Sequence, residues 1–226
     1  LLIEGQKYLL KISLDPDNRS LSTEKKALDS VSDLISSKVI NYENDKDSGI
    51  EFLLVSWENG ENFDSFGVDE LLYNLGTFVC NLDFMHESNC SELISFEEKF
   101  SENESIIEIL DSSDEIEKSI FAKLVDLNED DIKHIFSILK NIFEERYSED
   151  ITVLCHSNLK KSNILYQSEY IKFINFERSH KADIYYSLTK VINNLGLFKS
   201  AKKVSAFLRK YHSVSKLINH LSVEEF

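Results

Sequence analysis

The spacing of the hydrophobic residues changes once along the chain, and this change limits the folds open to it. Residues 7–14 place an apolar side chain at every second position, which is typical of a β-strand. From residue 68 to residue 85 apolar side chains recur every three or four positions, which is typical of a helix. The order predicts an α+β fold with a β-rich lobe at residues 1–60, including one helix and a connector, and a helical lobe at residues 61–226.

Local patterns add further elements to both lobes. In the first lobe a helix capped by Ser22 or Thr23 follows the first strand, and a hairpin is predicted from residues 39–42 and 50–57. The predicted elements of the second lobe are a helix at 132–147, a strand at 151–155, a hairpin at 163–176, and helices at 184–195, 201–211 and 214–221. The second lobe is therefore expected to be mainly helical around one β-hairpin.

Charge and hydropathy argue against several classes of protein. The 226 residues carry 40 acidic against 25 basic side chains, a net charge of -15, whereas nucleic-acid binding needs clustered positive charge. No apolar run reaches the roughly 18 to 20 residues of a membrane span, and the start lacks a signal-peptide pattern. The three cysteines, Cys80, Cys90 and Cys155, have unrelated spacings that favour a reducing compartment. We therefore expect a soluble, cytoplasmic protein without a nucleic-acid partner.

The most informative stretch runs from His156 to Leu165 and reads His-Ser-Asn-Leu-Lys-Lys-Ser-Asn-Ile-Leu. After the predicted hairpin come Ile-Asn-Phe-Glu at 174–177 and Lys-Ala-Asp-Ile-Tyr-Tyr at 181–186. In order and spacing these segments resemble the aminoglycoside phosphotransferase and choline kinase family, which has a protein-kinase-like fold. The resemblance implies two lobes, a small β-rich one and a larger helical one. Since no glycine-rich phosphate loop is visible, it also implies that the small lobe is incomplete.

The resemblance assigns catalytic and metal-binding positions, and two of them are changed. His156 and Asn158 fall on the catalytic positions of the family's loop. Asn158 occupies the position of the proton acceptor, but a neutral amide cannot take a proton. Asn175 replaces a metal-binding aspartate, while Asn163 matches an intact second metal ligand. Glu177 is the one nearby carboxylate that could substitute. The alternative is a polar turn whose asparagines hydrogen-bond to local backbone groups.

The resemblance also assigns nucleotide-binding positions in the first lobe. Lys11 matches the lysine that contacts the nucleotide phosphates, and Glu24 on the following helix would be its partner. A lysine on the solvated face of a strand is the alternative. The strand and connector at residues 53–60 resemble the segment that binds adenine through its backbone, and Ser56 and Glu58 lie in it.

Three hypotheses follow from these patterns. The first is a pseudokinase, a binding or scaffolding component with an unknown protein partner and with ATP and Mg²⁺ binding weakened or absent. The second is an active ATP-dependent phosphotransferase acting on the hydroxyl of a small molecule, for which the acidic charge would suit a cationic acceptor. The third is an unrelated α+β interaction protein, in which Lys11, Asn163 and Asn175 would not converge on one cleft.

Overall fold

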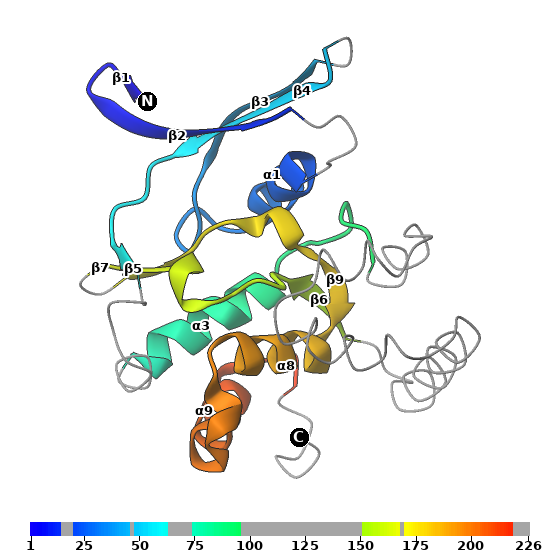
Figure 1. Cartoon of the computed structure of the whole chain (residues 1–226). Coiled ribbons are helices and arrows are strands. Elements are labelled where there is room, and N and C mark those ends of the chain that lie inside the picture. Colours follow the sequence, from blue (N-terminus) through cyan, green and yellow to red (C-terminus); the bar gives the residue numbers. More distant parts are fainter. Residues whose placement is uncertain (15–19, 46–47, 63–73, 96–150, 168–169, 219–226) are drawn as a thin grey trace, which may run out of the picture. The chain divides into compact units, whose positions relative to one another are not determined.

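The computed structural model describes residues 1–14, 20–45, 48–62, 74–95, 151–167 and 170–218. Contacts divide the chain into two compact units, residues 1–94 together with 151–226, and residues 95–150. The helices and strands described below all belong to the first unit (Figure 1).

The N-terminal part of this unit is an antiparallel sheet with one helix on it (Figure 1). Its strands are β1 (Leu2–Ile3), β2 (Gln6–Ser13), β3 (Val39–Asp45) and β4 (Ile50–Ser56), in the order β1-β2-β4-β3, and its helix is α1 (Ser20–Ser30). β4 alternates as a strand should, with Leu53 and Val55 buried on the face that α1 covers. Because Lys11 of β2 lies directly opposite Leu53 in the register, its side chain lies on that same face.

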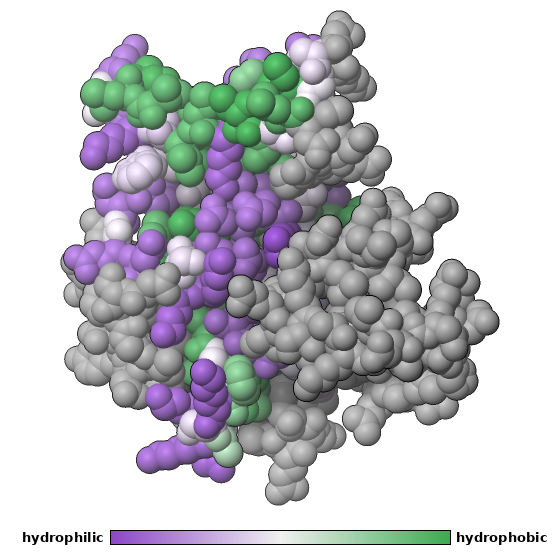
Figure 2. Space-filling view, in the orientation of Figure 1, coloured by the Kyte–Doolittle hydropathy of each residue, from purple (hydrophilic) through white to green (hydrophobic). Residues whose placement is uncertain are grey.

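The other face of the sheet carries exposed apolar side chains. Leu10 and Ile12 of β2 are 36% and 52% exposed, and Leu14 beyond the strand is 75% exposed. Figure 2 shows a hydrophobic band over β1 and β2 along the top of the view. The sheet therefore has one packed face and one exposed apolar face, and Lys11 lies on the packed one.

The described residues of the C-terminal part of the unit include three helices and several short strands. The helices are α3 (Leu75–His86), α8 (Ile184–Asn194) and α9 (Ala201–Val214). The strands are β5 (Glu61–Asn62), β6 (Thr152–Cys155), β7 (Ile164–Gln167), β8 (Tyr170–Phe173) and β9 (His180–Asp183), and the 3-10 turns are η2 (Lys161–Asn163), η3 (Phe176–Arg178) and η4 (Leu197–Lys199). β7 and β8 form the predicted hairpin, and β6 pairs with β9.

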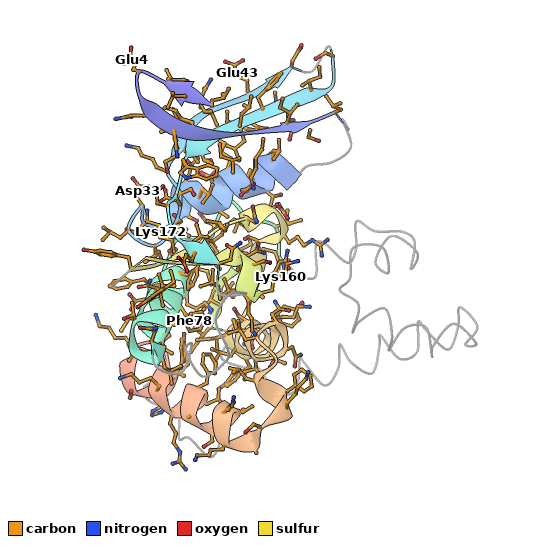
Figure 3. All side chains as sticks on the ribbon, turned by 60° about the vertical axis from the view of Figure 1, so that its left-hand side comes forward. Glu4, Asp33, Glu43, Phe78, Lys160 and Lys172 are labelled. Atoms are coloured by element: carbon orange, nitrogen blue, oxygen red, sulfur yellow. The ribbon has the colours of Figure 1, made fainter. Side chains whose placement is uncertain are left out.

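An aromatic cluster forms the core of this part. Phe78 of α3 is fully buried (Figure 3). Its ring centroid lies 5.6 Å from that of Phe173 in β8 and 6.4 Å from that of Phe207 in α9. Aromatic pairs in this range stabilise a core beyond the area they bury. The cluster therefore holds the hairpin and α9 against the same helix.

A buried histidine joins the three helices. His86 at the end of α3 lies 2.6 Å from the Tyr211 hydroxyl of α9 and 2.9 Å from the Ser187 hydroxyl of α8. Burial lowers the pKa of His86 to about 3, so the ring is neutral near neutral pH. Its two ring nitrogens are used by the helices themselves, which indicates a structural role.

Strand β8 joins the hairpin to the N-terminal part. The Phe173 N–H donates to the Ile35 carbonyl at 2.8 Å, and Lys172 Nζ donates to the Asp33 carbonyl at 3.0 Å (Figure 3). Lys172 also forms an ion pair with Glu58 of the connector at 2.7 Å. The end of the hairpin is thereby held against the segment that follows α1.

One predicted helix is wrong over the residues that the structure describes. The chain was expected to form a helix at 214–221, but α9 continues to Val214 and residues 215–218 are not helical. Ser215 adopts an extended conformation, and its N–H donates to the Tyr211 carbonyl at 2.8 Å, which closes the last turn of α9. Residues 219–221 lie outside the described residues.

Other expectations are tested only in part. The predicted helix at 132–147 lies outside the described residues, and so does the beginning of the helix expected from residue 68. The lobe boundary after residue 60 remains a prediction. Among the helices that the structure describes, none combines the length and the hydropathy that a membrane span requires.

Candidate functional site

Lys11 and Glu24 form the expected pair between strand β2 and helix α1. Lys11 Nζ donates to Glu24 Oε1 at 2.8 Å and to Oε2 at 2.7 Å. The Phe176 N–H donates to Glu24 Oε1 at 3.2 Å. Burial raises the pKa of the Glu24 carboxyl, and the Lys11 ammonium offsets part of that rise. The carboxylate is thus held between the sheet and the turn after the hairpin.

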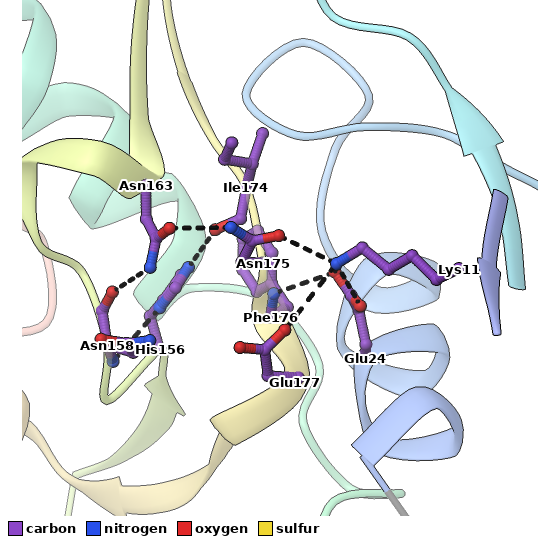
Figure 4. A network of polar contacts seen from close by, with 9 residues as sticks. All are labelled: Lys11, Glu24, His156, Asn158, Asn163, Ile174, Asn175, Phe176 and Glu177. Carbon is purple, nitrogen blue, oxygen red and sulfur yellow. Dashed lines mark hydrogen bonds and ion pairs between the residues drawn. The ribbon is translucent and has the colours of Figure 1, made fainter. Parts of the chain in front are cut away.

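Asn175 connects this ion pair to the C-terminal part (Figure 4). Its Oδ1 accepts a hydrogen bond from Lys11 Nζ at 2.9 Å, and its Nδ2 donates to Asn163 Oδ1 at 2.8 Å. An ammonium can only donate, so the amide oxygen faces Lys11 and the amide nitrogen faces Asn163. Together with the two bonds to Glu24, this contact uses all three N–H donors of Lys11.

Asn175 has a backbone conformation that few residues adopt readily. Its φ is 64°, in the left-handed region, just before η3. Among residues other than glycine, Asn and Asp populate this region most often. The local backbone therefore accounts for an Asn or an Asp at this position, and the side-chain contacts distinguish the two.

Asn163 fixes the loop that begins at His156. It is 3% exposed, and its Nδ2 donates to the Asn158 carbonyl at 2.7 Å. Its backbone carbonyl accepts the N–H of Ile174 at 3.0 Å. The network therefore extends from the N-terminal sheet through two asparagine side chains to this loop (Figure 4).

His156 is a buried, neutral side chain under the loop. Its Nε2 is 2.9 Å from the Ile174 carbonyl, and the Asn158 N–H points to its Nδ1 at 3.3 Å. Nε2 therefore donates and Nδ1 accepts, as in a neutral imidazole. Burial lowers the pKa of His156 to about 4, and its ring centroid is 4.5 Å from that of Phe176. This arrangement supports a role in positioning the loop.

A cleft of about 370 Å³ opens beside Lys11. Its walls include the apolar residues Leu9, Leu28, Val55, Leu165 and Ile174, and the polar residues Lys11, Glu24, Ser56, Glu58 and Asn175. Apolar walls with a few polar groups are typical of small-molecule sites, so the lining could hold the flat base of a nucleotide.

The connector side of the cleft is occupied by internal contacts. The Ser56 hydroxyl donates to Glu58 Oε1 at 2.6 Å, and Glu58 Oε2 is paired with Lys172. Trp57 between them is 48% exposed. The side chains of Ser56 and Glu58 are therefore engaged with each other and with the hairpin.

The residues at the expected metal position do not fit a divalent cation. Mg²⁺ is bound in proteins mainly through carboxylate oxygens, and the two amide oxygens here already accept hydrogen bonds from Lys11 and Asn175. Glu177 is 36% exposed, and its Oε2 lies 3.8 Å from Lys11 Nζ. Among the described residues no group of three or more His, Cys, Asp or Glu side chains is arranged for a metal.

The predicted site residues fall into two connected groups. Lys11, Glu24, Asn163, Asn175 and Glu177 converge, with His156 and Asn158 directly behind them (Figure 4). Ser56 and Glu58 line the other side of the same cleft. The hypothesis of an unrelated protein required that these residues lie apart, and it is wrong.

Two contributors to the site were not predicted. The backbone N–H of Phe176 binds Glu24, and Lys172 binds Glu58. A backbone donor leaves no trace in a sequence. Lys172 lies in a strand, where the alternation of side chains predicts the face on which it lies. The alternation does not predict that Glu58 is its partner.

A lysine–glutamate pair between a strand and a helix, bonded to the turn after a β-hairpin, agrees with the protein-kinase-like fold that the solved structures below share. The family to which the chain belongs is shown by its amino-acid sequence. The profile of the phosphotransferase enzyme family matches residues 1–226, so the chain belongs to that family.

Three solved structures illustrate the shared fold. An aminoglycoside phosphotransferase from Streptomyces rimosus, in complex with ADP and streptomycin, has a TM-score of 0.65 at 16% identity over 99% of this chain and 88% of its own. The Plasmodium vivax ethanolamine kinase has a TM-score of 0.60 at 18% identity, and the match covers 96% of this chain and 64% of the kinase. A choline/ethanolamine kinase family protein from Mesorhizobium loti has a TM-score of 0.58 at 15% identity, and the match covers 93% of this chain and 65% of that protein.

The chain spans less than two thirds of the length of the last two proteins. At these identities the likeness shows the fold alone. A search of curated protein sequences found no match.

Proposed function

We propose that this chain is a pseudokinase of the phosphotransferase family, which acts as a binding or scaffolding component and transfers phosphate slowly or not at all. The observation that carries the proposal is the bridge made by Asn175 between Lys11 Nζ and Asn163 Oδ1. The groups that the family resemblance assigns to metal and phosphate are bonded to one another. The polar groups beside the cleft are thus paired with each other.

The position assigned to the general base supports the same proposal. Asn158 offers a carbonyl oxygen that can orient a hydroxyl, but no group that takes up its proton. The bonds that Asn158 forms with His156 and Asn163 use its backbone N–H and carbonyl, so they supply no proton acceptor either. Loss of a general base slows a reaction by about 10² to 10⁴. The loss of a metal ligand at Asn175 acts on the same step, so the two effects are not additive.

Nucleotide binding is retained in this proposal in a weakened form. The apolar cleft walls and the connector backbone could hold a base, but all three donors of Lys11 are already used. A phosphate could bind Lys11 only by displacing Asn175 or by loosening Glu24. We therefore expect weak ATP binding that does not depend on Mg²⁺.

A second candidate function is an active phosphotransferase with a replacement carboxylate. Glu177 favours it, because its carboxylate lies 3.8 Å from Lys11 Nζ and is 36% exposed. In that case the substrate would be a small molecule with a hydroxyl group, and the net charge of -15 would suit a cationic one.

The test is an assay of ATP turnover with a panel of hydroxylated acceptors, some of them cationic. Wild type is compared with the double variant Asn158→Asp and Asn175→Asp, and with Asn193→Asp on the exposed side of α8 as a matched control. The pseudokinase proposal expects no turnover by wild type or by the control and measurable turnover by the double variant. Robust turnover by wild type that is lost in Glu177→Gln would establish the second function instead.

A further inference from the structure

Positive charge is concentrated near the C-terminal end of this acidic chain. Residues 184–218 contain seven lysines and arginines and no aspartate or glutamate, so all 40 acidic residues lie outside this stretch. Five of the seven lie on α9 or just before it, and we call them the basic face: Lys199, Lys202, Lys203, Arg209 and Lys210.

Four residues of the basic face lie on helix α9, and Lys199 lies in η4 just before it. Positions separated by seven residues, such as Lys202 and Arg209, lie on the same side of a helix two turns apart. The opposite side carries Phe207 and Tyr211, which are fully buried. Figure 3 shows α9 along the lower edge of the described residues, with side chains projecting outward from it.

Four cations of this face form no ion pair with a described carboxylate. Lys199, Lys202, Arg209 and Lys210 are exposed. The ion pairs between described residues involve other lysines and leave these four without a carboxylate partner. Their charges therefore face solvent.

The position of Lys202 also argues against a role in folding. It lies in the first turn of α9, where the free N–H groups give the helix end a partial positive charge and acidic residues are the stabilising choice. The first turn contains no acidic residue. Lys202 therefore does not stabilise the start of its own helix.

The shape of the face favours a short acidic partner over an extended anionic surface. A helix that binds in a membrane inserts an apolar side, but the apolar side of α9 is used in the core. DNA is also disfavoured by the net charge of -15 of the whole chain. Since charges are screened beyond about 10 Å at 0.1 M salt, a short segment would sense mainly the basic face.

We propose that the basic face of α9 is a docking surface for an acidic segment of another protein. The inference goes beyond the pseudokinase proposal and does not depend on it, because α9 contributes no residue to the lining of the cleft. Aspartate and glutamate side chains of the partner would pair with Lys202, Arg209 and Lys210 in a salt-dependent contact.

The test measures binding of a fluorescein-labelled polyglutamate peptide to the full chain by fluorescence anisotropy. The test variant carries Lys202→Glu, Arg209→Glu and Lys210→Glu. The matched control carries Lys7→Glu, Lys26→Glu and Lys38→Glu, which makes the same charge change on exposed lysines of the N-terminal part. A third variant, with glutamine at the three α9 positions, keeps the test valid if the reversed charges unfold the helix.

We expect both α9 variants to weaken binding by about tenfold or more, the control to bind as wild type does, and high salt to abolish binding. Equal weakening in the control would overturn the proposal, because the effect would then come from net charge. Stronger binding of wild type to anionic lipid vesicles or to duplex DNA than to the peptide would overturn it as well. So would the absence of measurable peptide binding at low salt.

Discussion

Lys11 and Asn175 lie 164 positions apart in the sequence, and Nζ of the first is 2.9 Å from Oδ1 of the second. This bond joins the N-terminal sheet to the turn after the hairpin. It places a fixed positive charge against the position that the family resemblance assigns to a metal ligand. An aspartate there would offer two charged oxygens, whereas the amide offers one neutral oxygen that the lysine already uses. The consequences of this contact can be measured.

The substitution Asn175→Asp should create metal dependence. Aspartate tolerates the left-handed backbone at this position and keeps an acceptor for Lys11, while Asn163 Oδ1 loses its donor and becomes free. We expect ATP alone and ATP with Mg²⁺ to affect the melting temperature of wild type equally. In the variant Mg²⁺ should add stability, by about 2.7 kcal/mol at 100 times the dissociation constant.

Thermal unfolding with ATP, with and without Mg²⁺, provides this measurement. The control is Asn193→Asp, which adds the same charge on the exposed side of α8. A Mg²⁺-dependent rise in the melting temperature of wild type as large as that in Asn175→Asp would contradict the expectation that the wild-type site binds no Mg²⁺.

The substitution Lys11→Met should destabilise the fold through Glu24. The Glu24 side chain is 2% exposed, so its carboxylate would remain buried without its counter-charge. Breaking a buried pair in this way costs about 3–5 kcal/mol near neutral pH. The loss should shrink as the pH falls and the Glu24 carboxyl becomes protonated. Urea unfolding at two pH values measures this, and a loss independent of pH would show that packing, and not charge, is responsible.

A companion variant separates charge from volume in that experiment. Lys11→Met combined with Glu24→Gln leaves no buried charge, although the Phe176 N–H keeps an acceptor. We expect the double variant to recover part of the loss and to remove its pH dependence.

The stability of the protein should fall as the pH drops below about 6.5. His86 and His156 have pKa values lowered by burial to about 3 and about 4, whereas unfolded histidine titrates near 6.5. Between these values the unfolded chain binds more protons, so each histidine lowers the free energy of unfolding by about 1.4 kcal/mol per pH unit. The raised pKa values of Glu24 and Asp83 act in the opposite direction at lower pH.

Urea unfolding between pH 7 and pH 5 checks this, because histidine is the main titrating group there. The variant His86→Gln should be less stable at neutral pH, since it disturbs the bonds to Tyr211 and Ser187. Its stability should nevertheless depend less steeply on pH than that of wild type. An unchanged slope would mean that His86 is not the buried neutral group described above.

The substitution Lys172→Met should loosen the connection between the hairpin and the N-terminal part. Lys172 pairs with Glu58 at 2.7 Å and donates to the carbonyls of Asp33 and Ser36. These side chains are partly exposed, so we expect a loss of about 1–2 kcal/mol in the free energy of unfolding. Amide hydrogen exchange should become faster at residues 33–36 and 57–60, and Lys26→Met on α1 should leave both quantities unchanged.

Much of the site could be predicted because its signals are local and ordered. The alternation in β2 predicts that Lys11 shares a face with Leu9 and Ser13, and the helix that follows offers Glu24 as a partner. The loop at His156 and the Asn-Ile-Leu strand that follows it form a motif whose order resembles one family. These features depend on periodicity and spacing, which a sequence displays directly.

Other features were decided by the tertiary structure alone. That Asn175 satisfies both Lys11 and Asn163, and that Lys172 holds Glu58, depends on the distance between segments far apart in the chain. The end of α9 at Val214 likewise depends on Ser215, whose extended backbone overrides a helical pattern. The sequence determined which groups are available and on which side of each strand or helix they lie. Only the packed chain decided which donor meets which acceptor, because a hydrogen bond requires a donor–acceptor distance of about 2.7 to 3.2 Å, a condition that no local pattern encodes.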